Sequence, residues 1–369
     1  MKNDWQTKNL GDLCRVRTGR KDVNEGNPDG EFPFFTCAAE HTFSDNYSFD
    51  TEALLIAGNG DVGKVSYYNG KFEAYQRTYV LSDFIDVLPR FLFLILDGKL
   101  KETVSKQKLG NTMPYIKVGM LTDFHLPVPP LAEQQRIVGL LDEAFKGIAT
   151  AKANAERNLQ NARALFESHL QSVFTQRSPG WVEKRLGEVG KVSMCKRIFK
   201  EETTTTGDIP FYKIGTFGKE PDAFIPIQIY NEYRTKYSFP KKGDVLISAS
   251  GTIGRRVRYD GEPAYFQDSN IVWIDNDEER VLNDFLYHFY GACKWNSTKG
   301  ATISRLYNDN LRGIVIAFPE SHQEQRLIVT QLDDLREETQ RLARLYERKL
   351  SALEALKRSL LHQAFTGEL

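Results

Sequence analysis

The chain has 369 residues, of which 41% are hydrophobic and 27% charged, and its 49 basic and 49 acidic side chains cancel to a formal net charge of zero. This composition predicts a soluble globular protein of two or three domains, and it excludes nucleic-acid binding through overall basicity, so that only local basic patches could bind a polyanion. The longest apolar run, residues 91–96, is too short to span a bilayer, and the start lacks a signal peptide, so we expect a cytoplasmic protein without a membrane partner.

The first 129 residues predict a mixed α/β domain. Short β-rich runs at residues 54–56 and 65–68 are punctuated by glycines, including an Asn69-Gly70 turn signal, and residues 91–101 predict a short helix. The four cysteines, Cys14, Cys37, Cys195 and Cys293, have neither zinc-ligand nor disulfide spacing, and we expect isolated buried thiols.

A proline-rich stretch at residues 127–130 ends this domain, and a long helical pattern follows over residues 130–177. A second mixed domain is expected at residues 178–320, with β-rich residues 245–247, a turn at Asp260-Gly261 and a helix at 281–290. A second long helix is expected at residues 321–369. About 45 helical residues make a rod of about 65 Å.

The two halves are copies of each other. The motif W-x-x-K-x-L-G-D at Trp5 returns 176 residues later at Trp181, with Glu in place of Asp, and the motif E-Q-x-x-I-V-x-x-L-D at Glu133 returns 191 residues later at Glu324. The second copy therefore has a net 15 extra residues in its globular part. Two copies of this length indicate tandem domains rather than a solenoid.

A heptad template fits both long helices and predicts a coiled-coil seam, alanine-rich in the first and leucine-rich in the second. Because the second domain begins where the first helix ends, the second helix must run back antiparallel to pair with the first. We therefore predict a pseudo-twofold object with Leu369 near Met1. The alternative is that each helix packs only on its own domain. The main seam positions are Ile137, Leu141, Ile148, Leu165, Ile328, Leu332, Leu335, Leu342, Leu353, Leu356 and Leu360.

The glycine-rich segment from Gly58 to Gly63 matches G-x-G-x-x-G, and Lys64 nearly completes a Walker loop. Both motifs need a following helix to hold phosphate, but a strand pattern follows Lys64, and the second copy lacks the first glycine. The segment therefore predicts a tight turn between strands. No catalytic motif is recognised, the histidines are dispersed, and no metal site is expected.

Basic and polar clusters recur at similar places in both copies, and they are the candidates for DNA contacts. Lysine and arginine can neutralise phosphates, while arginine, asparagine and threonine can reach base edges. Taken singly, each cluster is more often a solvated surface, but recurrence in two modules favours DNA. The candidates are Arg15, Arg17, Arg20, Lys21, Lys64, Lys106, Lys108, Asn111 and Thr112 in the first copy, and Lys196, Arg197, Arg255, Arg256, Lys299, Thr302, Ser304 and Arg305 in the second.

The two helix-start motifs, the opening W-x-x-K-x-L-G-[DE] of each half, residues 300–306 and the closing residues 361–369 together resemble the specificity subunits of type I restriction-modification enzymes. The resemblance covers the whole chain in the same order. It implies an α+β fold with two target-recognition domains, residues 1–129 and 178–320, and two conserved spacer helices, residues 130–177 and 321–369.

The resemblance also implies a function without catalysis in this chain. Each recognition domain would read one half of a bipartite, asymmetric double-stranded DNA target, and the helices would set the gap. Two modification subunits would carry S-adenosylmethionine and methylate adenine N6, and restriction subunits would use ATP and Mg²⁺, so no cofactor is expected here. Two alternatives remain: a coiled-coil scaffold, which leaves the paired basic clusters unexplained, and a nucleotide-binding enzyme, which explains only residues 58–64.

Overall fold

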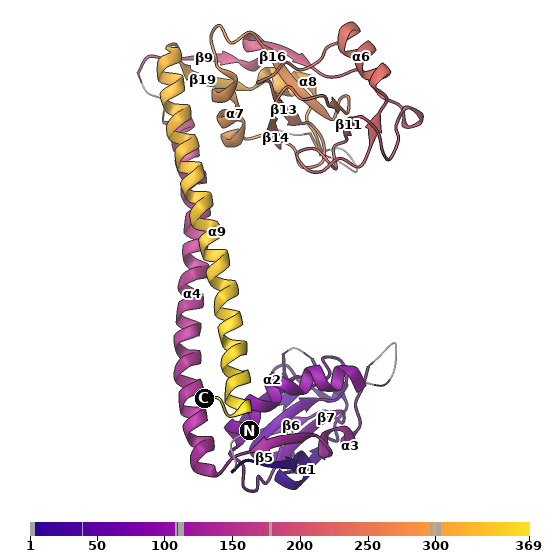
Figure 1. Ribbon diagram of the computed structural model, residues 1–369, viewed down its shortest axis with the longest axis vertical. Helices are drawn as coiled ribbons and strands as arrows, with labels where there is room; N and C mark the ends of the chain where they lie inside the picture. Colours follow the sequence, from indigo (N-terminus) through magenta and orange to yellow (C-terminus); the bar gives the residue numbers. More distant parts are fainter. Residues whose placement is uncertain are drawn as a thin grey trace. The chain divides into compact units, whose positions relative to one another are not determined.

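The chain divides into two compact units. The computed structural model describes residues 4–38, 40–107, 109, 114–176, 179–295, 298–299 and 304–369, with backbone only at 105–107, 298–299 and 304. Unit 1 comprises Met1–Glu156 and Glu347–Leu369, and unit 2 comprises Arg157–Tyr346. Both long helices are shared between the units, so each unit contains a globular part and a segment of both helices (Figure 1).

Unit 1 contains a six-stranded sheet in the order β2-β7-β5-β6-β3-β4, antiparallel except where β3 pairs with β6, and a separate β1-β8 pair. The helix α2 covers one face of this sheet (Figure 1). The elements are β1 Gln6–Asn9, α1 Leu10–Leu13, β2 Arg15–Thr18, η1 Val23–Glu25, β3 Phe32–Phe35, β4 Thr42–Ser44, β5 Phe49–Ala57, β6 Val65–Ala74, β7 Thr78–Ser82, α2 Pro89–Gln107, α3 Val118–Thr122, β8 His125–Val128 and α4 Leu131–Thr175.

Unit 2 repeats this plan with β10-β16-β13-β14, β12-β11-β15, and the pairs β9-β19 and β17-β18. The elements are β9 Trp181–Arg185, α5 Leu186–Val189, β10 Gly190–Ser193, η2 Lys200–Glu202, β11 Ile209–Tyr212, β12 Phe224–Ile225, α6 Ile227–Lys236, β13 Val245–Ser248, β14 Arg256–Arg258, β15 Tyr265–Phe266, β16 Ile271–Asn276, α7 Asn283–Ala292, β17 Thr298–Lys299, β18 Ser304–Arg305, α8 Asn308–Gly313, β19 Val315–Pro319 and α9 His322–Thr366.

The extra residues of the second copy lie between β11 and β13. Unit 2 has β12 and α6 there, whereas unit 1 has only β4 between β3 and β5. Two other differences separate the structure from the sequence prediction. Asn69 and Gly70 do not form a turn but lie inside β6, paired with Glu52 and Thr51 of β5, because β6 is ten residues long. Of the four cysteines, Cys293 is only partly buried.

The core of each unit includes residues from the long helices. In unit 1, Ile137 and Leu141 of α4 and Ala364 and Phe365 of α9 join the cluster formed by the sheet and α2.

The two ends of the described chain pack against this same cluster of unit 1, through Trp5 and Leu369. Arg136 Nη2 also donates a hydrogen bond to the Leu369 carbonyl at 2.7 Å. Both ends of the described chain therefore lie on unit 1, as connectivity predicts, although Met1 is outside the described residues.

The two helices run antiparallel where they meet within each unit. In unit 1, Lys152 Nζ lies 2.6 Å from Glu354 Oε1, and Lys357 lies over the ring of Phe145 at 5.3 Å. In unit 2, Leu170 and Leu332 share a small buried cluster with Ala292 of α7. As the residue number in α4 increases from 145 to 152 and 170, the number of its neighbour in α9 decreases from 357 to 354 and 332, which is the antiparallel arrangement.

The buried face follows an eleven-residue repeat over much of both helices, and two predicted seam residues are therefore wrong. Leu165 is 53% exposed and Leu356 is 47% exposed. An eleven-residue period has 3.67 residues per turn, so a strict heptad template drifts off the buried face. The positions that are buried or half-buried are Ala151, Ala155, Leu159, Ala162, Phe166, Leu170 and Val173 in α4, and Thr339, Leu342, Tyr346, Leu350, Leu353, Lys357, Leu361 and Ala364 in α9.

The other predicted seam residues are buried or half-buried. They are Ile137, Leu141 and Ile148 in α4, and Ile328, Leu332, Leu335, Leu342, Leu353 and Leu360 in α9. Four of them, Ile137, Leu141, Ile328 and Leu332, lie in the first three turns of their helices, before the heptad and the eleven-residue pattern separate, and Leu342 and Leu353 belong to both patterns.

Candidate nucleic-acid interface

A buried glutamine fixes the start of each long helix, and it is the Gln of the repeated E-Q-x-x-I-V motif. Gln134 and Gln325 are both 0% exposed. The Gln134 Oε1 accepts from the Leu88 amide at 2.8 Å, and its Nε2 donates to the carbonyls of Asp86 at 3.0 Å and Pro129 at 2.8 Å. Gln325 makes the same three bonds, at 2.7–2.8 Å, with Leu282, Arg280 and Pro319. The motif therefore attaches each helix to its own globular part.

The glycine-rich segment of each unit is a turn between strands, as the sequence predicts. Gly60 and Gly63 have φ of +63° and +80°, and their counterparts Gly251 and Gly254 have +64° and +84°. The Gly63 amide donates to the Ala57 carbonyl at 2.9 Å, which closes the β5–β6 connection. Since a strand rather than a helix follows, no helix N-terminus is available there to bind a nucleotide phosphate.

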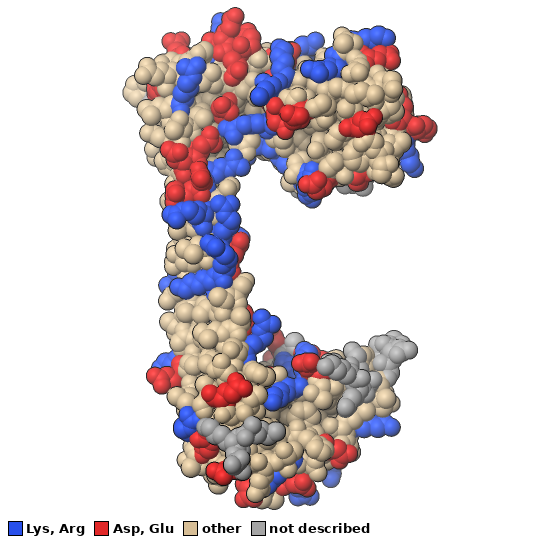
Figure 2. All heavy atoms as spheres, viewed as in Figure 1, with Lys and Arg blue, Asp and Glu red and all other residues tan. Residues whose placement is uncertain are grey.

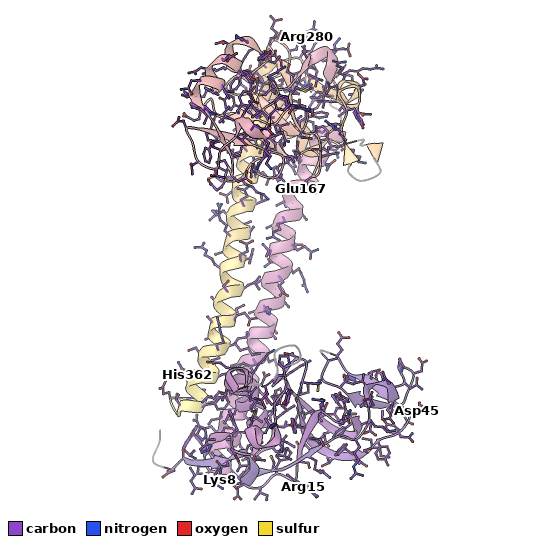
Figure 3. The ribbon with its side chains drawn as sticks, turned by 90° about the vertical axis from the view of Figure 1, so that its right-hand side faces the viewer. Lys8, Arg15, Asp45, Glu167, Arg280 and His362 are labelled. Atoms are coloured by element: carbon purple, nitrogen blue, oxygen red, sulfur yellow. The ribbon has the colours of Figure 1, made fainter. Side chains whose placement is uncertain are left out.

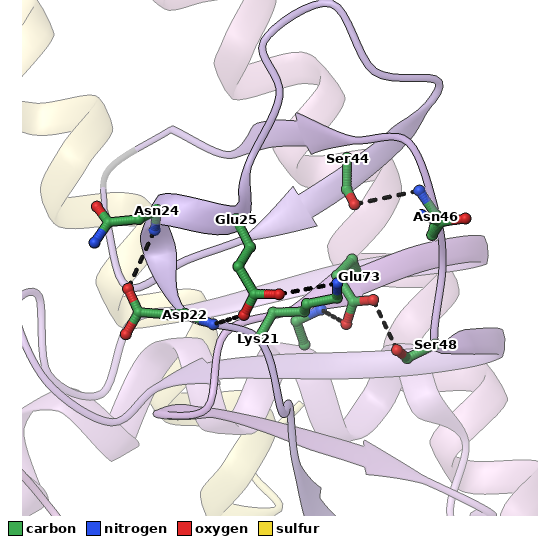
Figure 4. A network of polar contacts seen from close by, with 9 residues as sticks. Lys21, Asp22, Asn24, Glu25, Ser44, Asn46, Ser48 and Glu73 are labelled. Carbon is green, nitrogen blue, oxygen red and sulfur yellow. Dashed lines mark hydrogen bonds and ion pairs between the residues drawn. The ribbon is translucent and has the colours of Figure 1, made fainter.

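Two candidates of unit 1 are held by protein partners. Arg17 Nη2 donates to Ser82 Oγ at 2.8 Å, and its guanidinium lies 5.3 Å from the centre of the Phe49 ring. Lys21 Nζ pairs with Glu25 Oε2 at 3.1 Å, within a network of polar side chains around the turn at Asp22 (Figure 4). Both cations therefore have partners within unit 1.

Two other candidates of unit 1 face solvent. Arg15 and Arg20 are exposed and have no ion-pair partner among the described residues; Figure 3 shows Arg15 at one end of the globular part. Lys64 is half-buried next to the glycine turn. Of the unit 1 candidates, Arg15 and Arg20 are thus the most available to an external anion.

In unit 2 the candidates divide in the same way. Arg255 Nη1 donates to the Phe217 carbonyl at 2.9 Å, and Arg305 Nη2 donates to Ser269 Oγ at 2.8 Å, so both guanidinium groups hold loops.

Two other candidates of unit 2 are accessible. Arg197 is exposed although its Nε is 3.0 Å from Asp268 Oδ2. Lys196 is exposed over the ring of Tyr237 at 5.2 Å.

Lys108, Asn111, Thr112 and Thr302 lie outside the described residues, as do the side chains of Lys106, Lys299 and Ser304.

The aspartate that ends each helix-start motif makes an ion pair with an arginine that stacks on an aromatic ring. In unit 1, Asp142 Oδ1 lies 2.7 Å from Arg90 Nη2, and Arg90 lies over Phe93 at 5.2 Å. In unit 2, Asp333 Oδ2 lies 3.6 Å from Nη2 of Arg258, which stacks over Tyr287. The arginine comes from α2 in unit 1 but from β14 in unit 2. The repeated aspartate was visible in the sequence, but its changing partner was not.

A model of the type I restriction modification DNA specificity domain matches residues 2–158 and, a second time, residues 179–347. The chain belongs to this family. The two matches cover both globular parts and most of both helices.

Relatives and solved structures agree with this assignment to the specificity subunits. A Haemophilus influenzae protein named as a type I restriction enzyme specificity subunit is 40% identical over 331 residues, which is 85% of this chain and 83% of that protein. The type I restriction enzyme EcoDI specificity subunit of Escherichia coli is 39% identical over 154 residues, 42% of this chain and 34% of its own length.

Two solved structures share the fold at 19% identity. One comes from work on complex assembly and conformational transition of the type I restriction-modification system; it has a TM-score of 0.78 and covers 100% of this chain and 99% of its own. The other is the HsdS subunit of Thermoanaerobacter tengcongensis, with a TM-score of 0.63 and coverage of 100% and 98%.

Two kinds of site are not found in the part of the chain that the structure describes. No cluster of three or more histidine, cysteine or acidic side chains there is arranged to hold a metal ion. No described helix combines the length and apolarity needed to cross a membrane.

Proposed function

We propose that this specificity subunit reads a bipartite double-stranded DNA target, each globular part contacting one half. The observation that carries this proposal is the duplication itself: the DNA specificity domain occurs twice in one chain, with the same helix attachment in both copies. Exposed cations on both copies, Arg15 and Arg20 in unit 1 and Lys196 and Arg197 in unit 2, supply charge for phosphate contacts or base readout.

The long helices are proposed to set the gap between the half-sites. Each is a continuous helix of 45 residues, and a buried glutamine and an aspartate ion pair attach it to its globular part. A helix anchored in this way transmits a change of length directly to the domain attached to it, at about 1.5 Å per residue.

The same helices are proposed to recruit two modification subunits. Leu140, Leu165, Leu327 and Leu345 expose 43–58% of their surface on α4 and α9, and such apolar side chains suit protein contacts. Adenine N6 methylation would then take place in those subunits, with S-adenosylmethionine bound there. ATP and Mg²⁺ would be used by restriction subunits, and the complex would work in the cytoplasm.

The adenine methylome of the host, compared with that of a strain lacking this gene, tests the proposal. We expect one methylated motif with two defined halves and an unspecified gap to disappear on deletion and to return on complementation. A methylome unchanged by deletion, together with failure of the chain to copurify with a methyltransferase, would instead favour a scaffold without DNA-reading function.

A further inference from the structure

Three arginines of unit 2 surround the ring of Tyr287 on α7. The guanidinium carbons of Arg256, Arg258 and Arg336 lie 4.7, 3.8 and 5.4 Å from the ring centre. Arg336 Nη1 also donates to the Tyr287 hydroxyl at 2.9 Å. The negative face of an aromatic ring attracts a cation, but three guanidinium groups around one ring also repel one another.

Two carboxylates at this place both pair with Arg258, so that Arg256 and Arg336 have no ion pair within 4 Å among the described residues. Arg258 Nε lies 2.7 Å from Asp284 Oδ1, and its Nη2 lies 3.6 Å from Asp333, which also bonds to His288. Among those residues, the buried Nε of Arg256 also has no hydrogen-bond partner. Burial lowers the pKa of Arg256, while Glu167 of α4, labelled in Figure 3, favours its charged form.

Unit 1 indicates that the joint between helix and domain needs only one arginine. There Arg90 alone stacks on Phe93 and pairs with Asp142. In the repeat, Val65 stands at the position of Arg256, and Phe145 stands at the position of Arg336, each 191 residues earlier. Arg256 and Arg336 are therefore additional to the arginine–aspartate pair that both units share, although Arg336 also links α9 to α7 through the Tyr287 hydroxyl.

The additional charge continues along α9. Arg336, Gln340 and Arg344 are spaced by four residues and so share one helix face. Figure 2 shows lysine and arginine side chains along the helix segments of unit 2, next to a group of acidic side chains at its globular part. Arg344 is exposed and has no ion-pair partner among the described residues. By contrast, Arg341 pairs with Glu338 at 2.8 Å.

We propose that Arg256, Arg336 and Arg344 form a phosphate-binding strip that contacts the sugar-phosphate backbone of the DNA gap next to the half-site of unit 2. This inference rests on the proposed DNA-reading function. Guanidinium groups donate in a planar fork that matches a phosphate. The exposed Arg344 has no ion-pair partner among the described residues that a phosphate would have to displace. Arg336 and Arg344 lie on α9 itself and not on the loops that carry the exposed candidates Lys196 and Arg197, so we expect the strip to contact DNA without reading its sequence.

The test measures binding of the complex of this chain with its modification subunits to a duplex carrying the motif that the methylome identifies. Fluorescence anisotropy at several salt concentrations compares wild type with Arg344→Ala and with the matched control Arg341→Ala. We expect Arg344→Ala to lower the slope of log affinity against log salt by about one, and to weaken binding by the same factor for every gap sequence. The control should match wild type.

A second measurement changes the DNA instead of the protein, so its result does not depend on how well the variant folds. Methylphosphonate linkages, which remove the phosphate charge, are placed in the gap of the duplex, and they should abolish the difference between wild type and Arg344→Ala. The strip is refuted if Arg344→Ala and Arg341→Ala give the same salt slope, or if Arg344→Ala changes half-site preference. Failure of the wild-type complex to bind its duplex at all would instead refute the proposed function.

Discussion

His288 is a residue whose charge state should make the stability of unit 2 depend on pH. Its side chain is fully buried, and its Nε2 lies 3.0 Å from Asp333 Oδ1. Burial lowers the pKa of His288 from 6.5 to about 4, against the attraction of Asp333. Between these two values the unfolded chain binds more protons than the folded one at this residue. The contribution of His288 to the free energy of unfolding should therefore fall by about 1 kcal/mol for each pH unit below 6.5 and should stay constant above it.

Urea unfolding of wild type and His288→Leu between pH 4.5 and 8 checks this prediction. Leucine is the matched control because Leu94 occupies the corresponding place on α2, counted from the equivalent contacts of Gln134 and Gln325. The variant should lose the steep part of the pH dependence below 6.5. Parallel curves for the two proteins would contradict a buried neutral histidine.

The buried glutamines should contribute more to stability than any other polar side chain of the helix starts. Gln325→Ala leaves the Leu282 amide and two carbonyls without their partner, and an unsatisfied buried group costs about 1–3 kcal/mol. We expect a loss of at least about 2 kcal/mol in urea unfolding, and a similar loss for Gln134→Ala. Gln340→Ala, on an exposed helix face, is the control and should change stability by less than about 0.5 kcal/mol. Equal effects at Gln325 and Gln340 would disprove the attachment role.

At the scale of the element, the eleven-residue repeat of the helices makes opposite predictions for two leucines of α4. Leu165 is on the predicted heptad seam but is 53% exposed, whereas Leu170 is off that seam and is 1% exposed. Leu170→Ala should therefore cost about 2–5 kcal/mol in thermal or urea unfolding, and Leu165→Ala less than about 0.5 kcal/mol. If Leu165→Ala lowered the free energy of unfolding more than Leu170→Ala, the helices would pack along the heptad seam after all.

The sequence predicted these elements well where the signal is local or repeated, and poorly where it depends on distant partners. The duplication, both long helices and the strand-connecting glycine turns follow from spacing alone. The heptad template predicted two wrong seam residues because 3.5 and 3.67 residues per turn give the same buried positions over a few turns and diverge over a longer helix. From the sequence, Arg17 and Arg305 were expected to be free for DNA contacts. Their hydrogen-bond acceptors, Ser82 and Ser269, lie 65 and 36 residues away along the chain, so the local sequence gives no sign of them.

For the whole molecule, the proposed role of the helices as a ruler predicts how the DNA target changes with helix length. Removing four residues from both α4 and α9 shortens each by about 6 Å, roughly the rise of two base pairs, and turns it by only about 40°, so the buried faces can still meet. Glutamine and aspartate attachments at both helix starts remain intact if the deletion is made near the middle of each helix.

The methylome of a strain carrying this double deletion should then show both half-sites unchanged and a gap shorter by one or two base pairs. The half-sites are unaffected because no globular residue is altered, and only the distance between the readers changes. A deletion of four residues from one globular loop, such as the exposed or half-buried residues 219–222 between β11 and β12, is the matched control and should leave the gap length as it is. If the shortened helices gave new half-sites with the old gap, the spacing would have to be set elsewhere, for example by the modification subunits.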